Sequence, residues 1–284
     1  MNYNNLTKLF RYENENGDSI VFDYSGGFLI NKPKGIDTLT VRMNEAQSID
    51  QVGSTIQSIN VQSRPVKISG VLVGEFQTEN KDRLLSVIRP DLEGRLYADD
   101  YYLTVRPTAT PTIEQKPSLA AFQFTLLAPY PYWQKDDSTS ATLMAVKKGF
   151  KFPWNISKAY RFGTATAAQF ITVSNRGQVP IPYTVTFTAL TDVVNPKITD
   201  ASSGKYLLLN KRLVAGEKVV IEITHERTFV TSSVDGECRG ALDLKSSFFR
   251  LKVGDNVLKP EADSGKENLL VDVNYAIEVV GIAL

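Results

Sequence analysis

Alternation of apolar and polar residues is the dominant pattern of this sequence, and it predicts β-strands along most of the chain. In residues 181–188, Ile, Tyr, Val and Phe alternate with Pro and Thr, so one face is buried and the other faces water. The same pattern predicts further strands over 66–73, 122–127, 219–224 and 270–280. Gly70 lies inside the first of these, where we expect a bulge or a close approach of another backbone.

One segment, residues 78–89, has helical rather than alternating spacing. Its apolar residues Leu84, Leu85 and Ile88 share one side, and charged residues lie opposite. The threonine at its start is suited to cap a helix, and Pro90 ends it. The chain is therefore predicted to be an all-β protein with one short helix.

A polar stretch at 135–140 follows the aromatic cluster at 130–133 and predicts a linker. A chain of 284 residues is about two domains long at ~150 residues per domain. We therefore expect domains over 1–134 and 135–284. A second aromatic cluster, at 150–154, opens the second domain, and the two clusters either pin the junction or form a surface for a sugar or a partner.

Composition excludes several classes of protein. The chain has 32 Lys and Arg against 31 Asp and Glu, so its net charge of +1 does not suit broad binding to nucleic-acid phosphates. A single cysteine, Cys238, excludes an internal disulfide, and a single histidine, His225, excludes a His-rich zinc site. The first 20 residues lack the apolar region of a signal peptide, and no run approaches the ~18 apolar residues of a membrane span. We expect a soluble product made in the cytoplasm, with no membrane insertion.

Nucleophilic catalysis has little support in the sequence. Cys238 and His225 are the only cysteine–histidine pair available, and no protease signature surrounds either. The Gly-x-Ser-x-Gly elbow and the phosphate-binding loop Gly-x-x-x-x-Gly-Lys-Ser/Thr are both absent. We therefore predict no catalytic residue and no cofactor.

Paired carboxylates are the remaining chemical candidates. Asp99 and Asp100 are adjacent, so on a strand they would point to opposite faces, and we expect a turn before a strand that starts at Tyr101. Two acidic turns could offer oxygen ligands to calcium, but neither belongs to an EF-hand loop. These turns contain Asp91 with Glu93 and Asp235 with Glu237. We expect them to satisfy local backbone donors and predict no metal site.

The order of several motifs resembles that of one family. In the first half these are Arg64-Pro65 with Gly70 in the strand 66–73, the Leu-Leu helix ending at Pro90, Tyr102–Pro107, the strand 122–127 and the closing Pro131-Tyr132-Trp133. In the second half they are Val173–Pro182 with Asn175, Asn195–Ile198, Gly204–Leu207, Leu213–Glu217 with Gly216, and Phe248–Asn256. Together they resemble the distal tail (Dit-like) proteins of long-tailed, non-contractile phages.

The resemblance implies an N-terminal domain related to a β-barrel or split barrel that assembles into a hexameric ring, and a C-terminal galectin-like β-sandwich. It implies a place in the virion tail, with the tail tube protein, a tail-associated lysin-type protein and receptor-binding baseplate proteins as partners. In that family the strand after the position of Gly216 often ends in an Asp-Thr pair, but in this chain the strand ends at Thr224-His225. The sugar-binding His-x-Asn-x-Arg of galectins is not matched. An edge strand such as 66–73 is our expectation for the ring interface.

Two other functions stay open at this point. A carbohydrate-binding module or host-surface adhesin would use the aromatic clusters, with Trp133 or Trp154 as the sugar-stacking residue. A small hydrolase would use a pair of Asp or Glu residues.

Overall fold

The structure is a computed structural model that describes residues 9–73, 77–115, 119–136, 139–143, 145–148, 163–166 and 170–283. It divides into two compact units. The first contains Met1–Asp136 together with Glu278–Leu284, and the second contains Asp137–Ile277. The expected division after residue 134 assigned the last residues of the chain to the second domain, but in the structure they belong to the first. The second unit is therefore an insertion into the first.

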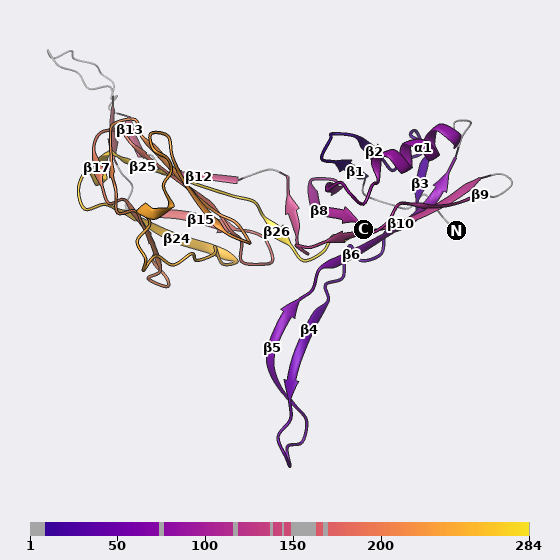
Figure 1. Ribbon diagram of the computed structural model, residues 1–284. Coiled ribbons are helices and arrows are strands. Elements are labelled where there is room, and N and C mark those ends of the chain that lie inside the picture. The colour runs from indigo at the N-terminus through magenta and orange to yellow at the C-terminus, as the bar shows by residue number, and fades with distance from the viewer. Residues whose placement is uncertain are drawn as a thin grey trace. The chain divides into compact units, whose positions relative to one another are not determined.

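The first unit is built on one ten-stranded antiparallel sheet that curls into a near-closed barrel (Figure 1). Its main path runs β2-β1-β7-β8-β10-β6-β3, with β9 paired to β10 and with β11 joining β8 to β26. The bounds are β1 Phe10–Asn14, β2 Ser19–Val21, β3 Phe28–Ile30, β6 Arg64–Leu72, β7 Gly94–Ala98, β8 Tyr101–Pro107, β9 Thr112–Gln115, β10 Ala120–Ala128, β11 Trp133–Lys135 and β26 Glu278–Val279. A separate two-stranded sheet holds β4 (Val41–Ala46) and β5 (Thr55–Val61).

The predicted helix is present as α1 (Gln77–Val87), the single α-helix in the described part of the chain. Leu84 and Ile88 are fully buried in the core of the first unit, as the helical spacing predicts. Leu85 is 41% exposed, so the prediction that it shares the buried side is wrong. No helix among the described residues is long and apolar enough to span a membrane.

Strand β6 is an interior strand of the barrel. It pairs with β10 along its whole length and with β3 over Leu72, Val71 and Gly70. The expectation that this segment is an edge strand at a ring interface is therefore wrong, because its hydrogen-bonding groups are already used on both sides. At Gly70 a Cβ atom would lie 2.1 Å from the Leu29 carbonyl oxygen and 2.9 Å from the Phe122 ring, so the glycine permits the close approach that was predicted.

The second unit has two main antiparallel sheets around a common apolar core. The first has the order β12-β25-β16-β21-β22-β23, and the second has the order β15-β24-β18-β19. Their bounds are β12 Thr139–Leu143, β15 Ile171–Asn175, β16 Thr184–Ala189, β18 Lys197–Asp200, β19 Tyr206–Leu208, β21 Lys218–Ile223, β22 Thr228–Ser232, β23 Gly236–Glu237, β24 Gly254–Glu261 and β25 Leu269–Tyr275. Two small hairpins complete it, β13 (Ala145–Lys148) with β14 (Gly163–Thr166) and β17 (Val193–Val194) with β20 (Arg212–Leu213), along with the short 3-10 turns Arg239–Ala241 and Lys266–Asn268. The all-β prediction with one helix and a two-sheet second domain is confirmed.

Most of the predicted strands are present. Residues 181, 183, 185 and 187 are all buried, although the ladder of β16 begins only at Thr184, after Pro180 and Pro182. The prediction of one strand over 270–280 is wrong. It is divided into β25 in the second unit and β26 in the first. Buried positions fall on odd numbers up to Tyr275 and then shift to Glu278, so the phase of the alternation changes where the chain passes between units.

Candidate functional site: an exposed hairpin and a buried arginine anchor

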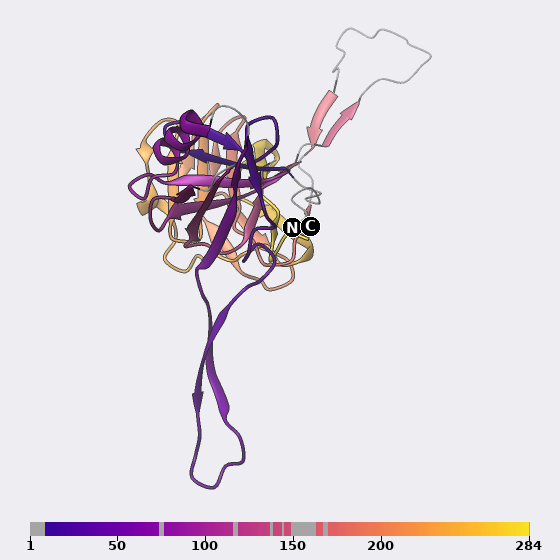
Figure 2. The same ribbon diagram turned by 90° about the vertical axis from the view of Figure 1, so that its right-hand side faces the viewer.

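The hairpin β4–β5 extends from the barrel of the first unit without packing on its core (Figures 1 and 2). The two strands pair only with each other. Nearly all of residues 41–61 are exposed to solvent. An isolated two-stranded hairpin is marginally stable in water, so this one needs a further surface to pack against.

One face of the hairpin is apolar. Val41 lies opposite Val61 and Met43 opposite Ile59, and because strand residues two apart share a face, these four side chains form one patch. Their exposed fractions are 38%, 42%, 48% and 56% in that order. The opposite face carries the pairs Arg42–Asn60 and Asn44–Ser58, and the Asn44 amide donates a 2.8 Å hydrogen bond to the Ser58 hydroxyl. The hairpin is thus amphipathic, and none of the residues that the structure describes covers its apolar face.

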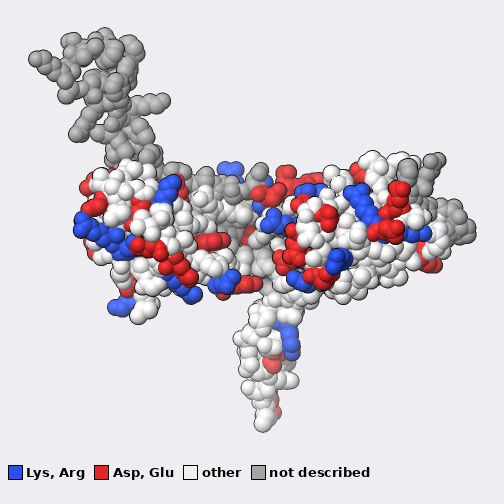
Figure 3. Space-filling model, turned by 45° about the horizontal axis from the view of Figure 1, so that its top comes forward, with Lys and Arg blue, Asp and Glu red and all other residues white. Residues whose placement is uncertain are grey.

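The tip of the hairpin carries two further exposed apolar side chains among polar ones. Ile49 and Val52 are 96% and 102% exposed, which are among the highest values for large apolar residues in the described chain. The hairpin carries only three charged residues, Arg42, Glu45 and Asp50. In Figure 3 it is the mostly white projection, while Lys and Arg lie among Asp and Glu over the visible face of both units. Contiguous exposed apolar groups of this kind are typical of protein–protein contact surfaces.

This hairpin is not among the strands predicted from the sequence. The signal is present, because apolar and polar residues alternate over 41–44 and 58–61, and Gly53-Ser54 lies between these segments as a turn. The alternation predicts a half-buried strand, but in this chain its apolar positions face solvent. Periodicity finds which residues share a face, and it does not tell whether the same chain covers that face.

A second feature of the first unit is the Arg64 anchor, defined here as Arg64 with its four carbonyl acceptors. Arg64 is 2% exposed. Its Nε donates to the Pro131 carbonyl (2.7 Å), its Nη1 donates to the carbonyls of Gly35 (3.0 Å) and Ile36 (2.8 Å), and its Nη2 donates to that of Val280. Burial lowers the pKa of Arg64, and the nearby Asp37 and Tyr132 act to raise it. The guanidinium stays charged and links strand β6 to three distant parts of the chain, at 35–36, 131 and 280.

Trp133 belongs to the same cluster. It is fully buried, and its indole nitrogen donates a 3.0 Å hydrogen bond to the Ile36 carbonyl, which also accepts from Arg64 and from the Ile282 backbone. A tryptophan in this position has no face available to a sugar, so the expectation that Trp133 belongs to a sugar-binding surface is wrong. Tyr132 is partly exposed and its ring lies 5.3 Å from that of Tyr130. The cluster at 150–154, which contains Trp154, lies outside the described residues.

The end of the chain completes this cluster. Glu278 is 1% exposed and accepts hydrogen bonds from the Tyr130 hydroxyl and from the Gln134 amide (3.2 Å). Ile282 is 4% exposed in the core of the first unit. The motif residues Arg64, Pro131 and Trp133 therefore meet where the C-terminal segment closes the barrel.

The other motif residues lie apart from this cluster. Pro65 is exposed on β6 beside Arg64. Asn175 is 1% exposed, and its amide donates to the carbonyls of Val179 (2.9 Å) and Leu251 (3.1 Å), so it organises a turn of the second unit. Gly216 has a φ of +82°, which other residues rarely adopt, and it forms the turn before β21.

The structure places His225 in the turn between β21 and β22, and Cys238 directly before the 3-10 turn Arg239–Ala241. Burial raises the pKa of the Cys238 thiol, so it stays protonated and weakly nucleophilic. Asp99 and Asp100 form the turn between β7 and β8, as predicted, and Asp99 accepts a 3.0 Å hydrogen bond from the Leu9 backbone. No group of three or more His, Cys, Asp or Glu in the described ranges could hold a metal ion.

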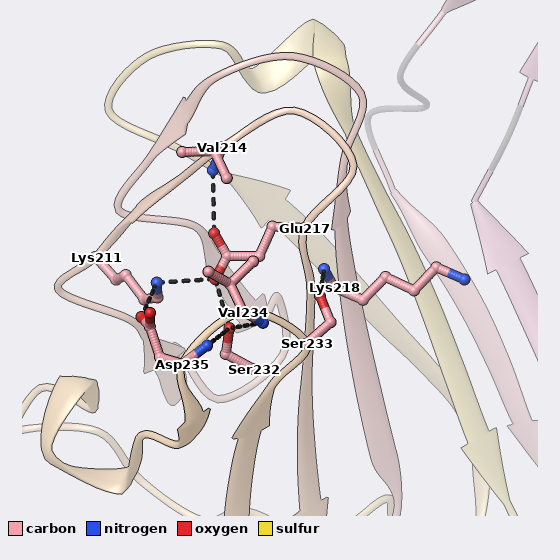
Figure 4. A network of polar contacts seen from close by, with 8 residues as sticks. All are labelled: Lys211, Val214, Glu217, Lys218, Ser232, Ser233, Val234 and Asp235. Carbon is pink, nitrogen blue, oxygen red and sulfur yellow. Dashed lines mark hydrogen bonds and ion pairs between the residues drawn. The ribbon is translucent and has the colours of Figure 1, made fainter.

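The second unit contains a buried polar network around Glu217 (Figure 4). The Glu217 carboxylate accepts from Lys211 Nζ (2.8 Å), the Ser232 hydroxyl (2.6 Å) and the Val214 backbone (3.1 Å), and Lys211 also contacts Asp235 at 2.6 Å. Burial acts to raise the pKa of Glu217, but these hydrogen bonds outweigh it and lower the pKa overall. The network fixes the turns at 214–217 and 232–235.

Replacing Glu217 with glutamine is expected to destabilise the second unit by about 3 kcal/mol at pH 7, because the substitution leaves Lys211 with only the exposed Asp235. A lowered pKa contributes stability above the ordinary value of 4.5 and loses it as the pH falls through the folded value. The difference from wild type should therefore shrink below about pH 4.5. Urea unfolding between pH 3.5 and pH 7 measures it. Glu222→Gln, at an exposed position of β21, is the control, and an equal loss in both variants would contradict this assignment.

Comparison with known proteins gives a consistent result. Residues 176–277 match the family described as "Siphovirus-type tail component, C-terminal domain". SPP1 Dit (gp 19.1), described as a paradigm of the hub adsorption apparatus in phages that infect Gram-positive bacteria, is similar in fold, with a TM-score of 0.68 and 13% identity over 95% of this chain and 98% of its own. A chain of the phage P2 baseplate in its activated conformation with Ca is similar with a TM-score of 0.50 and 11% identity, over 98% of this chain and 100% of its own.

No curated protein matches the sequence. The two structural likenesses cover nearly the whole chain, and at these identities they concern the fold. The sequence match falls within the second unit. Residues 176–277 are therefore similar in sequence to the siphovirus-type tail components, and the fold of nearly the whole chain is similar to that of SPP1 Dit.

Proposed function

We propose that this chain is the structural hub of a phage tail tip, and that it assembles into a closed ring of six copies through the β4–β5 hairpin. The observation that carries the proposal is the apolar face formed by Val41, Met43, Ile59 and Val61, which no residue in the described part of the chain covers. The fold likeness to SPP1 Dit supports the role of hub, and the family resemblance of the sequence motifs supports the number six.

A ring explains why the hairpin is exposed in the single chain. In a closed cyclic assembly each copy contacts the next through two different surfaces, so an arm from one copy packs on a neighbour and every arm is covered. Both edges of the hairpin also carry unpaired backbone groups, which a neighbouring strand can pair with. Neither kind of contact requires a cofactor or an active site.

The proposed partners follow from the place of such a ring in the virion tail. One side of the ring would join the tail tube, and the other would join the adsorption apparatus, including a lysin-type tail protein and receptor-binding baseplate proteins. The role is structural and not enzymatic. The low charge of the hairpin supports attachment by apolar contact over attachment by long-range electrostatic attraction.

Replacing Ile59 with lysine is expected to break the ring into single chains, because it places a charge in the centre of the apolar face. Asn60→Lys is the matched control, since it adds the same charge one residue away on the polar face. Light scattering coupled to size-exclusion chromatography measures the mass of each. Loss of the ring in both variants, or in neither, would contradict the role given to this face.

A further inference from the structure

A pocket of about 290 Å³ lies in the second unit at the turn between β21 and β22. It is lined by residues from three separate parts of the chain: the turn, the 3-10 turn that starts at Arg239, and the loop before Leu251. The side chains that matter for its chemistry are Arg227, Arg239, Arg250, His225, Glu226 and Phe248. Nothing in the proposed ring uses this pocket.

Three guanidinium groups line one concavity, and each of them lacks a carboxylate partner among the described residues. Arg212 in the same unit forms an ion pair with Asp192, but Arg227, Arg239 and Arg250 form none. Glu226 is the single acidic residue in the lining. The pocket therefore concentrates positive charge in a protein whose Lys and Arg elsewhere are balanced by Asp and Glu.

Neighbouring groups restrict the position of one of these arginines, Arg227. The Arg227 guanidinium lies over the Phe229 ring, 4.5 Å from its centre, which restricts the side chain. The backbone nitrogens of Glu226 and Arg227 both donate to the Thr224 hydroxyl and so hold the turn that presents Arg227. An arginine held in this way loses less freedom when it binds a ligand.

The number of arginines indicates the shape of the ligand. A carboxylate has two oxygens in one plane and is satisfied by a single bidentate arginine. A phosphate group has four oxygens in a tetrahedral arrangement, and its unesterified oxygens, three in a monoester and two in a diester, can accept hydrogen bonds from several directions, so it offers acceptors to several guanidinium groups at once. The volume of the pocket is also large enough for a phosphate with part of the group that carries it.

We propose that this pocket binds the phosphate group of a ligand outside the chain, with Arg227, Arg239 and Arg250 as its donors. The ligand class is a phosphomonoester or phosphodiester, such as a phosphorylated sugar or a polyol-phosphate chain. Phe248 would contact the apolar part of the carrier, since it is 47% exposed and lines the same pocket.

The test uses the full-length protein and three probes: inorganic phosphate, glycerol 3-phosphate and dimethyl phosphate. NMR or calorimetric titration against sodium chloride of equal ionic strength should give saturable binding for at least one probe, with a Kd on the order of 1–10 mM. Binding of the first two alone assigns the site to monoesters, and binding of dimethyl phosphate assigns it to a diester chain.

The double variant Arg227→Gln/Arg250→Gln should weaken binding at least tenfold, because two of three donors are lost. Arg176→Gln, an exposed arginine of the same unit that does not line the pocket, is the control and should bind as wild type. The absence of saturable binding, equal binding by the double variant, or a preference for a glutamate-rich peptide over every phosphate probe would overturn the proposal. The ring should form in all of these variants, so this result is separable from the proposed function.

Discussion

Replacing Arg64 with alanine is expected to be among the most destabilising single changes in the first unit, with a loss of about 4 kcal/mol or more in the free energy of unfolding. The substitution removes four hydrogen bonds from a charged donor, and the carbonyl groups of Pro131, Gly35, Ile36 and Val280 lose that donor. Urea unfolding followed by hydrogen exchange measures the stability of the first unit separately from that of the second.

The expected loss of stability depends on the geometry of the Arg64 guanidinium and not on its charge alone. Arg64→Lys keeps the charge but presents its donors from one atom, so it should still cost about 2 kcal/mol. Arg89→Ala is the control, because Arg89 forms an exposed ion pair with Asp91 at 2.5 Å and the substitution should change the free energy of unfolding far less than Arg64→Ala. A loss of similar size in the free energy of unfolding for Arg64→Ala and Arg89→Ala would contradict the stabilising role given to the Arg64 anchor.

Removing residues 278–284 is expected to unfold the first unit while the second stays folded. The deletion removes strand β26, the buried Glu278 and Ile282, and one acceptor of Arg64. Loss of Ile282 alone from a core should cost about 2–5 kcal/mol. Limited proteolysis followed by mass spectrometry identifies which unit is cut.

A matched variant tests the cause of this effect. Strand β26 pairs with β11 at Gln134 and Trp133, so a short Gly-Ser linker can join Asp136 directly to Glu278 and replace the second unit. This shortened chain should fold, but residues 1–136 alone should not. Equal stability with and without the C-terminal segment would show that the segment is not part of the first unit's fold.

Local patterns were sufficient to predict most strands and the helix. Residues 181–188 and 122–127 alternate, and their buried faces are as predicted, because that alternation reflects a single sheet face against one core. The helix at 78–89 was identified from its spacing, cap and terminal proline, all of which act within a few residues.

The features that matter for assembly depend on distant contacts. Arg64 binds carbonyls 67 and 216 residues away, and no local pattern encodes such partners. The break in 270–280 required knowing that the chain returns to the first unit. For the candidate site, motif order pointed to Arg64, Pro131 and Trp133 as a group, but the ring surface was expected on β6, which is interior. The hairpin was not predicted, because its apolar face has no partner among the described residues of the chain.

The central claim is that the hairpin face is covered by another copy in a ring of six. Native mass spectrometry of the intact protein at micromolar concentration, supported by negative-stain microscopy, tests it most directly. We expect a species with six times the 31.5 kDa mass of the chain and ring-shaped particles. A single chain of 31.5 kDa that persists at the highest concentrations reached would contradict the claim.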